Sequence, residues 1–387
     1  MKKIINIGFC VCLWITFFFQ YIYAQENENI GLAPQAGSAY VFEYNSEKVV
    51  FAKNENEKLF PASMTKMMGL LLIYEQLHAG KLSFDDMVVT SANAASMGGS
   101  QVYLEENETM SVRDLVESIC IASANDAMVA MAEKIGGSHE HFVEMMNTKA
   151  KQLKMTNTHF VNATGLHDEN HYTTAKDMGI LAKALLAEGQ DDLLAITSTY
   201  DAYIREDSEQ PFWLVNTNKL LRQYPGVDGL KSGYTSQAKS CITITAKKDG
   251  VRLIAVVMKE PDSKTRNQEI MQLLDYGFQK FNVKTLYKKG QEVGNVSINN
   301  AKVKEVSVYA KQDISLVYEN ENDVKVTKEE IILTKQKAPY KKGEVIAKLQ
   351  LQLQDGSLLT SDLYIEEDIE AIQYVDVFMQ TLQKIFV

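Results

Sequence analysis

The 387-residue sequence has little of several features that would identify its function at once. It holds only 4 cysteines, and because two of them are Cys10 and Cys12, neither a disulfide framework nor a zinc-ligand spacing is present. Prolines number only 6, while hydrophobic residues make up 45%, which excludes long disordered regions. A positive charge excess is also missing: the net charge is −10, so we expect no nucleic-acid partner.

The N-terminus carries a targeting signal. Lys2 and Lys3 precede an apolar run from Ile4 to Phe19, and Ala24 is the expected last residue before cleavage. We therefore predict a signal peptide over residues 1–24, with an uncleaved membrane anchor as the alternative. Under both interpretations the remainder is exported to the outer face of the cytoplasmic membrane or the cell envelope.

The rest of the chain divides by hydrophobic pattern. Residues 25–281 begin with a predicted β-hairpin, continue with a helical pattern to about Gly189, and return to strands between Val227 and Met258 before a last helix. This order predicts an α+β fold in which one antiparallel sheet is covered by helices. Residues 282–366 alternate apolar and charged positions, which predicts a small all-β domain.

The last residues, 367–387, place apolar side chains on one broad face at helical spacing. This pattern predicts an amphipathic helix that associates with a membrane surface. Docking of the same face on the β domain is the alternative, and the acidic flank from Glu366 to Glu370 favours it.

The first segment that carries chemistry is Pro61 to Met68, at the start of a predicted helix that is apolar on nearly all sides and must be buried. Ser63 and Lys66 are three residues apart, which puts them on one helix face within reach of each other. A lysine with a pKa lowered by desolvation is able to take the serine proton and activate the hydroxyl as a nucleophile. The pattern is weak alone, because Ser236 to Lys239 repeats it in an expected loop.

Two further segments offer polar groups to a shared cleft. Ser123 and Asn125 lie between two helical stretches, where the hydroxyl would relay a proton and the carboxamide would hold a substrate amide. Lys231, Ser232 and Gly233 lie on a predicted strand. A cation and a hydroxyl there suit the carboxylate of an extended peptide, and glycine allows its close approach to the backbone.

In this order, the three segments resemble the S-x-x-K, S-x-N and K-T-G motifs of penicillin-binding proteins and β-lactamases. Their flanking residues are similar to the low-molecular-weight penicillin-binding proteins that act as serine D-Ala-D-Ala carboxypeptidases, over roughly residues 30 to 385. The segments that carry this similarity are Phe60 to Lys66, Ala124 to Ala127, Asn216 to Leu221 and Val227 to Lys231. The sequence departs from that family at Ser232, where threonine is usual.

The resemblance implies a role for each matching residue. Ser63 would be the nucleophile, Lys66 its base and Ser123 a proton relay, while Asn125 would hold the substrate. The remaining implied positions bind substrate: Lys231, Ser232 and Gly233 on the receiving strand, Arg266 at the terminal carboxylate, and the backbone N–H groups of Ser63 and Tyr234 as the oxyanion hole.

The implied substrate is a peptidoglycan stem pentapeptide ending in D-Ala-D-Ala, with β-lactam antibiotics as covalent inhibitors and no cofactor or metal. A serine β-lactamase is the enzymatic alternative, although no E-x-x-L-N segment is found. A wall-binding protein with a degenerate site is the non-enzymatic alternative, which the intact motif residues oppose.

Several other residues invite a functional interpretation that we do not adopt. Four histidines lie in polar segments, and we expect surface loop residues rather than metal ligands: His139, His141, His167 and His171. Cys120 and Cys241 lie near the second and third motifs, and we expect both to be buried small hydrophobes.

Overall fold

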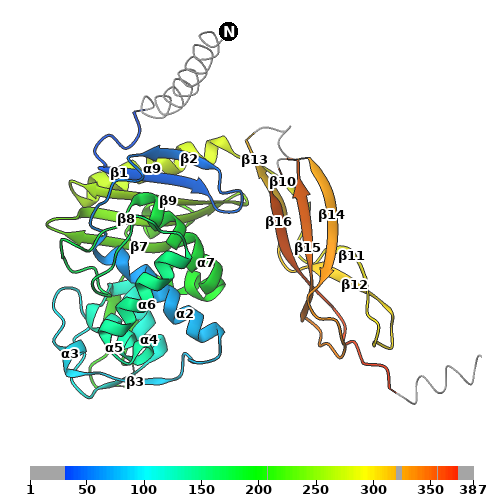
Figure 1. The fold of residues 1–387 in the computed structure, drawn as a ribbon, viewed down its shortest axis with the longest axis horizontal. Helices are drawn as coiled ribbons and strands as arrows, with labels where there is room; N and C mark the ends of the chain where they lie inside the picture. The colour runs from blue at the N-terminus through cyan, green and yellow to red at the C-terminus, as the bar shows by residue number, and fades with distance from the viewer. Residues whose placement is uncertain (1–30, 207, 320–324, 355, 374–387) are drawn as a thin grey trace, which may run out of the picture. The chain divides into compact units, whose positions relative to one another are not determined.

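The computed structural model describes residues 31–206, 208–319, 325–354 and 356–373 (Figure 1). By their contacts the chain separates into two compact units, with the boundary between Gln279 and Lys280 and the turn Asp249–Val251 grouped with the second unit. The expected signal peptide, residues 1–24, lies outside the described residues.

The first unit is built on a five-stranded sheet with the order β2-β1-β9-β8-β7. Its strands are β1 (Ser38–Glu43), β2 (Val49–Lys53), β7 (Val227–Thr235), β8 (Lys239–Lys248) and β9 (Val251–Glu260). The central strands β8 and β9 are buried over most of their length, because helices cover both faces of the sheet (Figure 1). Strand β7 lies at the edge, so one side of its backbone is open to a further extended segment.

Helices pack on both faces of the sheet (Figure 1). The longer ones are α2 (Lys66–His78), α4 (Val112–Glu117), α5 (Asn125–Gly136), α6 (His139–Gln152), α7 (Ala175–Thr197) and α9 (Ser263–Lys280). The expectation that the helix after Ser63 is buried is confirmed, since every residue from Lys66 to Tyr74 is buried in α2. Helix α9 lies on the opposite face of the sheet from α2 (Figure 1).

Short elements position the motifs. They are the 3₁₀ turn η1 (Ala62–Thr65), α3 (Ala92–Ala95), the π-helical turn η2 (Ser118–Ala122) and α8 (Leu220–Gln223). Two small ribbons pair β3 (Met87–Val89) with β4 (Thr109–Ser111), and β5 (Asp201–Ile204) with β6 (Phe212–Val215). The first ribbon interrupts the stretch that the sequence pattern predicted to be helical throughout, because Met110 and Val88 alternate inward at strand spacing.

The second unit contains only strands in its described part. A five-stranded sheet has the order β11-β12-β16-β15-β14, and β10 pairs with β13. The strands are β10 (Asn282–Tyr287), β11 (Glu292–Ser297), β12 (Glu305–Ala310), β13 (Ile314–Tyr318), β14 (Val326–Leu333), β15 (Val345–Leu353) and β16 (Leu358–Tyr364). One face forms a core that includes Val308, Leu349 and Leu363. The predicted all-β domain is therefore confirmed.

The predicted tail helix over residues 367–387 does not begin where the sequence pattern placed it. Ile369 pairs with Tyr340 and Ala371 pairs with Ala301 as β-bridges, so the chain stays extended to these positions and adds to the β unit. Residues 374–387, which hold most of the predicted helix, lie outside the described residues. Among the described helices, none is long and apolar enough to cross a membrane.

Candidate active site

Ser63 and Lys66 face each other at the start of the buried helix. Lys66 Nζ lies 3.0 Å from Ser63 Oγ and 2.9 Å from the carbonyl oxygen of Thr164, and its residue is 0% exposed. Burial, assisted by the nearby charge of Lys231, lowers the pKa of Lys66 well below its ordinary value, and Asp126 opposes this shift only in part. A neutral amine at this position has a lone pair that can accept the Ser63 proton.

A tight turn that the sequence reasoning missed presents the Thr164 carbonyl to Lys66. Asn162 Oδ1 accepts hydrogen bonds from the amides of Thr164 and Gly165 at 3.1 and 2.7 Å, which closes the turn. Gly165 has φ +83, and a Cβ there would lie 1.8 Å from the carbonyl oxygen of Ala62. Only glycine allows the two turns to pack this closely. The signal was the short run from Asn162 to Gly165, in which asparagine and glycine favour a turn.

His171 also supports η1 (Ala62–Thr65), called the nucleophile turn because it carries Ser63, the predicted nucleophile. The prediction that His171 is a surface residue is wrong. The residue is 2% exposed, and its Nε2 lies 2.8 Å from Thr65 Oγ1. The amide of Val161 donates to Nδ1 at 3.1 Å, so Nδ1 is the acceptor and the ring hydrogen is on Nε2. Burial lowers the pKa of His171 to about 4, which keeps the ring neutral. His141 is exposed, as expected, but it lies in helix α6 and not in a loop.

The second motif lies between η2 and α5. Ser123 has left-handed backbone angles (φ 64, ψ 30) and is 3% exposed, and its Oγ has no hydrogen-bond partner in the described part of the chain. Asn125 begins α5, where its amide donates to the Ser100 carbonyl and its Nδ2 to the Gly98 carbonyl, each at 2.7 Å. The carboxamide therefore has a fixed orientation, and the buried hydroxyl is available for a reaction partner.

The third motif lies on the edge strand β7. Lys231 is 1% exposed, and burial is the main cause that lowers its pKa to about 8. Ser232 Oγ donates to Thr217 Oγ1 at 2.8 Å, and the Thr217 amide donates to the carbonyl of Ile121 in η2. Thr217 thus links the strand to η2, the turn that directly precedes Ser123. The segment Asn216 to Leu221, which contains Thr217, resembles the family in sequence, but the sequence alone predicts no role for Thr217.

Gly233 brings β7 against the nucleophile turn. A Cβ on this residue would lie 2.8 Å from the Pro61 carbonyl oxygen and 3.0 Å from the Ser63 amide nitrogen. The strand therefore passes close to Ser63 only because this position has no side chain. The following residue, Tyr234, directs its side chain outward and is 66% exposed.

Arg266 lies on α9 behind this region. It is 5% exposed, and its Nη1 donates at 3.3 Å to the carbonyl of Cys241, the residue paired with Gly233 across β7 and β8. Its Nε and Nη2 donate to Asn267 Oδ1 at 3.1 and 2.8 Å. The guanidinium is thus placed beside the motif strand, held by its neighbours.

The two cysteines are buried, which confirms the sequence prediction. Burial raises the pKa of Cys120 to about 12 and that of Cys241 to about 11, so both thiols stay protonated at neutral pH. Neither thiol is poised as a nucleophile.

A serine in contact with a fully buried lysine at the start of a buried helix, next to an open edge strand, defines the class of serine acyl-transfer enzymes to which penicillin-binding proteins belong. The chain matches the family model described as D-alanyl-D-alanine carboxypeptidase over residues 24–262. Residues 281–371 match the model of the penicillin-binding protein 5 C-terminal domain. The chain belongs to this family of serine D-Ala-D-Ala carboxypeptidases.

Individual proteins of this family are similar to the chain in sequence and in structure. The chain is 41% identical to the D-alanyl-D-alanine carboxypeptidase DacF of Bacillus subtilis, over 99% of this chain and 98% of that protein. The structure is similar to penicillin-binding protein 5 of Haemophilus influenzae, with a TM-score of 0.63 and 31% identity over 88% of this chain and 100% of that one. It also resembles the ampicillin-bound penicillin-binding protein D2 of Listeria monocytogenes, with a TM-score of 0.58 and 29% identity over 65% of this chain and 99% of that one.

Proposed function

We propose that this enzyme removes the terminal D-alanine from peptidoglycan stem pentapeptides through an acyl-enzyme on Ser63. The observation that carries the proposal is the 3.0 Å contact between Ser63 Oγ and the fully buried Nζ of Lys66, in a chain of this family. β-Lactam antibiotics would acylate the same hydroxyl, because their ring carbonyl is attacked in the same way.

In the proposed acylation, neutral Lys66 takes the Ser63 proton as Oγ attacks the carbonyl carbon of the penultimate D-alanine. The oxyanion receives hydrogen bonds from the amides of Ser63 and Tyr234. When the tetrahedral intermediate collapses, the peptide C–N bond breaks and the leaving amine takes a proton through Ser123. Lys66, neutral again once its proton has passed to the amine, takes a proton from the water that attacks the ester. It gives this proton to Ser63 Oγ as the ester C–O bond breaks and the shortened peptide leaves as the acid.

The proposed substrate lies along β7 as an added strand. Asn125 holds the peptide amide, while Lys231, Ser232 and Arg266 supply the charge and hydrogen bonds for the terminal carboxylate. Support for this arrangement comes from the burial of Lys231 and Arg266 and from the open edge of β7.

The test compares wild type with Ser63→Ala by intact-protein mass spectrometry after penicillin, and by D-alanine release from a pentapeptide. Wild type should gain one penicillin mass and release D-alanine, and Ser63→Ala should do neither. Ser236→Ala is the matched control, since it removes the serine of the second S-x-x-K copy, in the turn between β7 and β8. Labelling that persists in Ser63→Ala would overturn the assignment, and rapid hydrolysis of penicillin would indicate a β-lactamase.

We also propose that the enzyme is exported and that residues 374–387 associate with a membrane surface. The support is the apolar run of residues 4–19 and the amphipathic sequence pattern of the tail. Because Ile369 and Ala371 belong to the β unit, truncation is best made after Gln373. The truncated enzyme, with its signal peptide removed, should leave the membrane fraction and keep its activity, and retention on membranes would contradict the role of the tail.

A further inference from the structure

The orientation of Asn125 depends on an irregular segment, residues 97–108, that lies between α3 and β4. The carbonyls of Gly98 and Ser100 in this segment are the acceptors for the Asn125 side chain and amide, each at 2.7 Å. No regular ladder of hydrogen bonds fixes the path of such a segment. Its end is tied to Thr90 by two backbone hydrogen bonds, from the Asn107 amide to Thr90 O at 2.9 Å and from the Thr90 amide to Glu108 O at 2.8 Å. Side chains from other elements hold the part that precedes Asn107.

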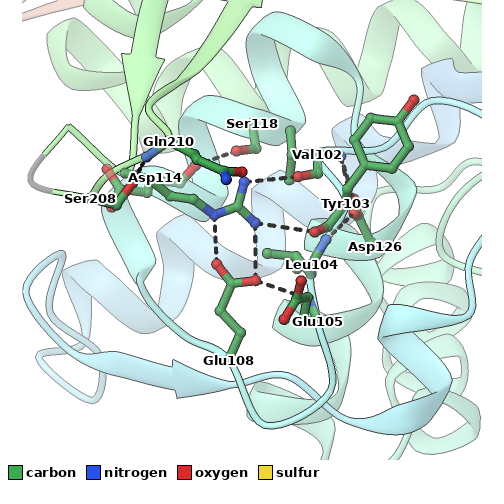
Figure 2. Close-up of polar contacts among 11 residues, drawn as sticks. Val102, Tyr103, Leu104, Glu105, Glu108, Asp114, Ser118, Asp126, Ser208 and Gln210 are labelled. Atoms are coloured by element: carbon green, nitrogen blue, oxygen red, sulfur yellow. Dashed lines mark hydrogen bonds and ion pairs between the residues drawn. The ribbon is translucent and has the colours of Figure 1, made fainter.

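One of these side chains comes from α5. The Asp126 carboxylate accepts hydrogen bonds from the amides of Val102 and Leu104, at 3.0 and 3.1 Å to Oδ2 (Figure 2). Asp126 is 1% exposed, so these bonds are shielded from water. The amides of the segment are thus tied to the helix that carries Asn125.

The carbonyls of the same segment are held from the other side by Arg205, which follows β5. Its Nη1 donates to Val102 O at 2.9 Å and its Nη2 to Tyr103 O at 3.3 Å. Its Nε and Nη2 also donate to Glu108 Oε1 and Oε2, at 2.6 and 3.0 Å. Figure 2 shows Glu108 at the end of the segment, where it also accepts from the Glu105 amide at 2.9 Å.

This guanidinium is well placed to hold the segment. The side chains of Arg205 and Glu108 are only 19% and 22% exposed, so their ion pair is partly shielded from solvent. Two parallel N–H donors meet the two carboxylate oxygens, a geometry that a lysine cannot reproduce. A ring contact between Tyr103 and Phe212 of β6, at 6.0 Å between centroids, adds a second link between hairpin and segment.

We propose that Arg205 is a positioning residue for substrate binding: by clamping Val102, Tyr103 and Glu108, it fixes residues 97–108 and thereby the carboxamide of Asn125. The inference rests on the proposed function. It means that recognition of the stem peptide depends on the β5–β6 hairpin, which contributes no group to the chemical step.

Arg205→Gln tests this clamp, because glutamine keeps a polar side chain but lacks the positive charge and the two parallel N–H donors of the guanidinium. With the segment loosened, KM for a D-Ala-D-Ala pentapeptide should rise about tenfold. The value of kcat per penicillin-titrated site should stay within about twofold of the wild-type value. The pH at which kcat falls on the acid side should not change, because Lys66 is untouched. Arg205→Lys, which keeps the charge, should give an intermediate KM.

Arg222→Gln is the matched control. Arg222 pairs with Asp201 of the same hairpin at 3.6 Å, with 63% of its side chain exposed, and it does not hold the segment. Its KM should equal that of wild type. Hydrogen exchange at the Val102 and Leu104 amides should accelerate in Arg205→Gln and not in Arg222→Gln, which separates local loosening from general unfolding.

A wild-type KM in Arg205→Gln would overturn the proposal, as would an equal rise of KM in both variants. Unchanged exchange at Val102 and Leu104 would also overturn it, since the segment would then not depend on Arg205. If wild type itself neither binds penicillin nor releases D-alanine, the proposed function is what fails, and the exchange measurement still decides whether Arg205 holds the segment.

Discussion

Thr65 and His171 are 106 residues apart in sequence, yet their side chains share a buried 2.8 Å hydrogen bond. Thr65 lies between the serine and the lysine of the first motif, so the bond ties that turn to the segment that precedes α7. The ring is held by a second bond, from the Val161 amide to Nδ1. A neutral imidazole satisfies both partners, whereas a protonated one loses its acceptor nitrogen.

We therefore predict that His171 makes the fold acid-sensitive. Burial holds its folded-state pKa at about 4, below the unfolded value of about 6.5. Stability that is complete above pH 6.5 is then lost as pH falls towards 4, by about 2 kcal/mol between pH 7 and pH 5. Urea unfolding of wild type and His171→Gln at both pH values checks this, because glutamine can make both hydrogen bonds without titrating.

His141→Gln is the control, since His141 is exposed. It should lose as much stability as wild type between pH 7 and pH 5. An equal loss in His171→Gln would show that other groups cause the acid sensitivity.

Lys231 should set the pH range of acylation through its charge. Its proximity helps to lower the pKa of Lys66, so its removal in Lys231→Met should raise that pKa. In the proposed mechanism only neutral Lys66 accepts the Ser63 proton. The acid limb of the acylation rate should therefore move to higher pH, by about one unit, while the rate itself falls. Stopped-flow acylation by penicillin from pH 5 to pH 10 measures this. Lys239→Met, at an exposed lysine, should leave the limb in place, and a shift to lower pH in Lys231→Met would contradict the prediction.

Much of the fold was predictable from the sequence because its signals are local. The two apolar runs of β1 and β2 around a turn, the apolar runs of β8 and β9, and the all-round apolar pattern of α2 each follow from a few neighbouring residues. The ribbon β5–β6 was not predicted, since its outward positions carry Tyr203 and Trp213, which hide the alternation.

The site was predictable only in part, for a related reason. Ser63 and Lys66 are three residues apart, so helix geometry alone brings them together. Thr164, Thr217 and His171 reach the site through contacts between distant segments, and nothing in their local sequence requires burial. The prediction of a helix beginning at residue 367 was wrong for the opposite reason. The apolar residues around Ala371 do have helical spacing, but Ala371 pairs with Ala301 as a β-bridge.

A buried carboxyl should limit stability at high pH. Glu260 at the end of β9 is 0% exposed, and burial together with the neighbouring Glu269 raises its pKa to about 8. Lys53 and Arg266 also face it and oppose this shift only in part. The folded state favours the protonated acid, so stability present below pH 4.5 should fall as pH rises towards 8.

Thermal unfolding between pH 5 and pH 9 tests this prediction. Glu260→Gln keeps the shape of the protonated acid, so it should unfold at a higher temperature than wild type at pH 8 and match it near pH 5. Glu57→Gln, at an exposed carboxylate, should follow wild type throughout. Identical pH profiles of Glu260→Gln and wild type would show that Glu260 is ionised at no cost.

The close approach of Gly165 to the nucleophile turn gives the sharpest steric prediction. In Gly165→Ala the new Cβ would lie 1.8 Å from Ala62 O and 2.9 Å from Thr65 Oγ1, so the two turns must separate. That movement withdraws the Thr164 carbonyl from Lys66. We expect a loss of about 3 kcal/mol or more in unfolding free energy and at least about a hundredfold slower acylation by penicillin.

Gly80→Ala isolates the steric part of this effect. Gly80 has φ +65, close to the +83 of Gly165, but a Cβ there meets nothing within 4 Å. The control therefore carries the same backbone penalty, about 1 to 2 kcal/mol, without the clash, and its acylation rate should match that of wild type. Denaturant unfolding and penicillin acylation of both variants measure the difference. Equal stability loss and equal acylation in the two would mean that the contact with Ala62 does not hold the nucleophile turn.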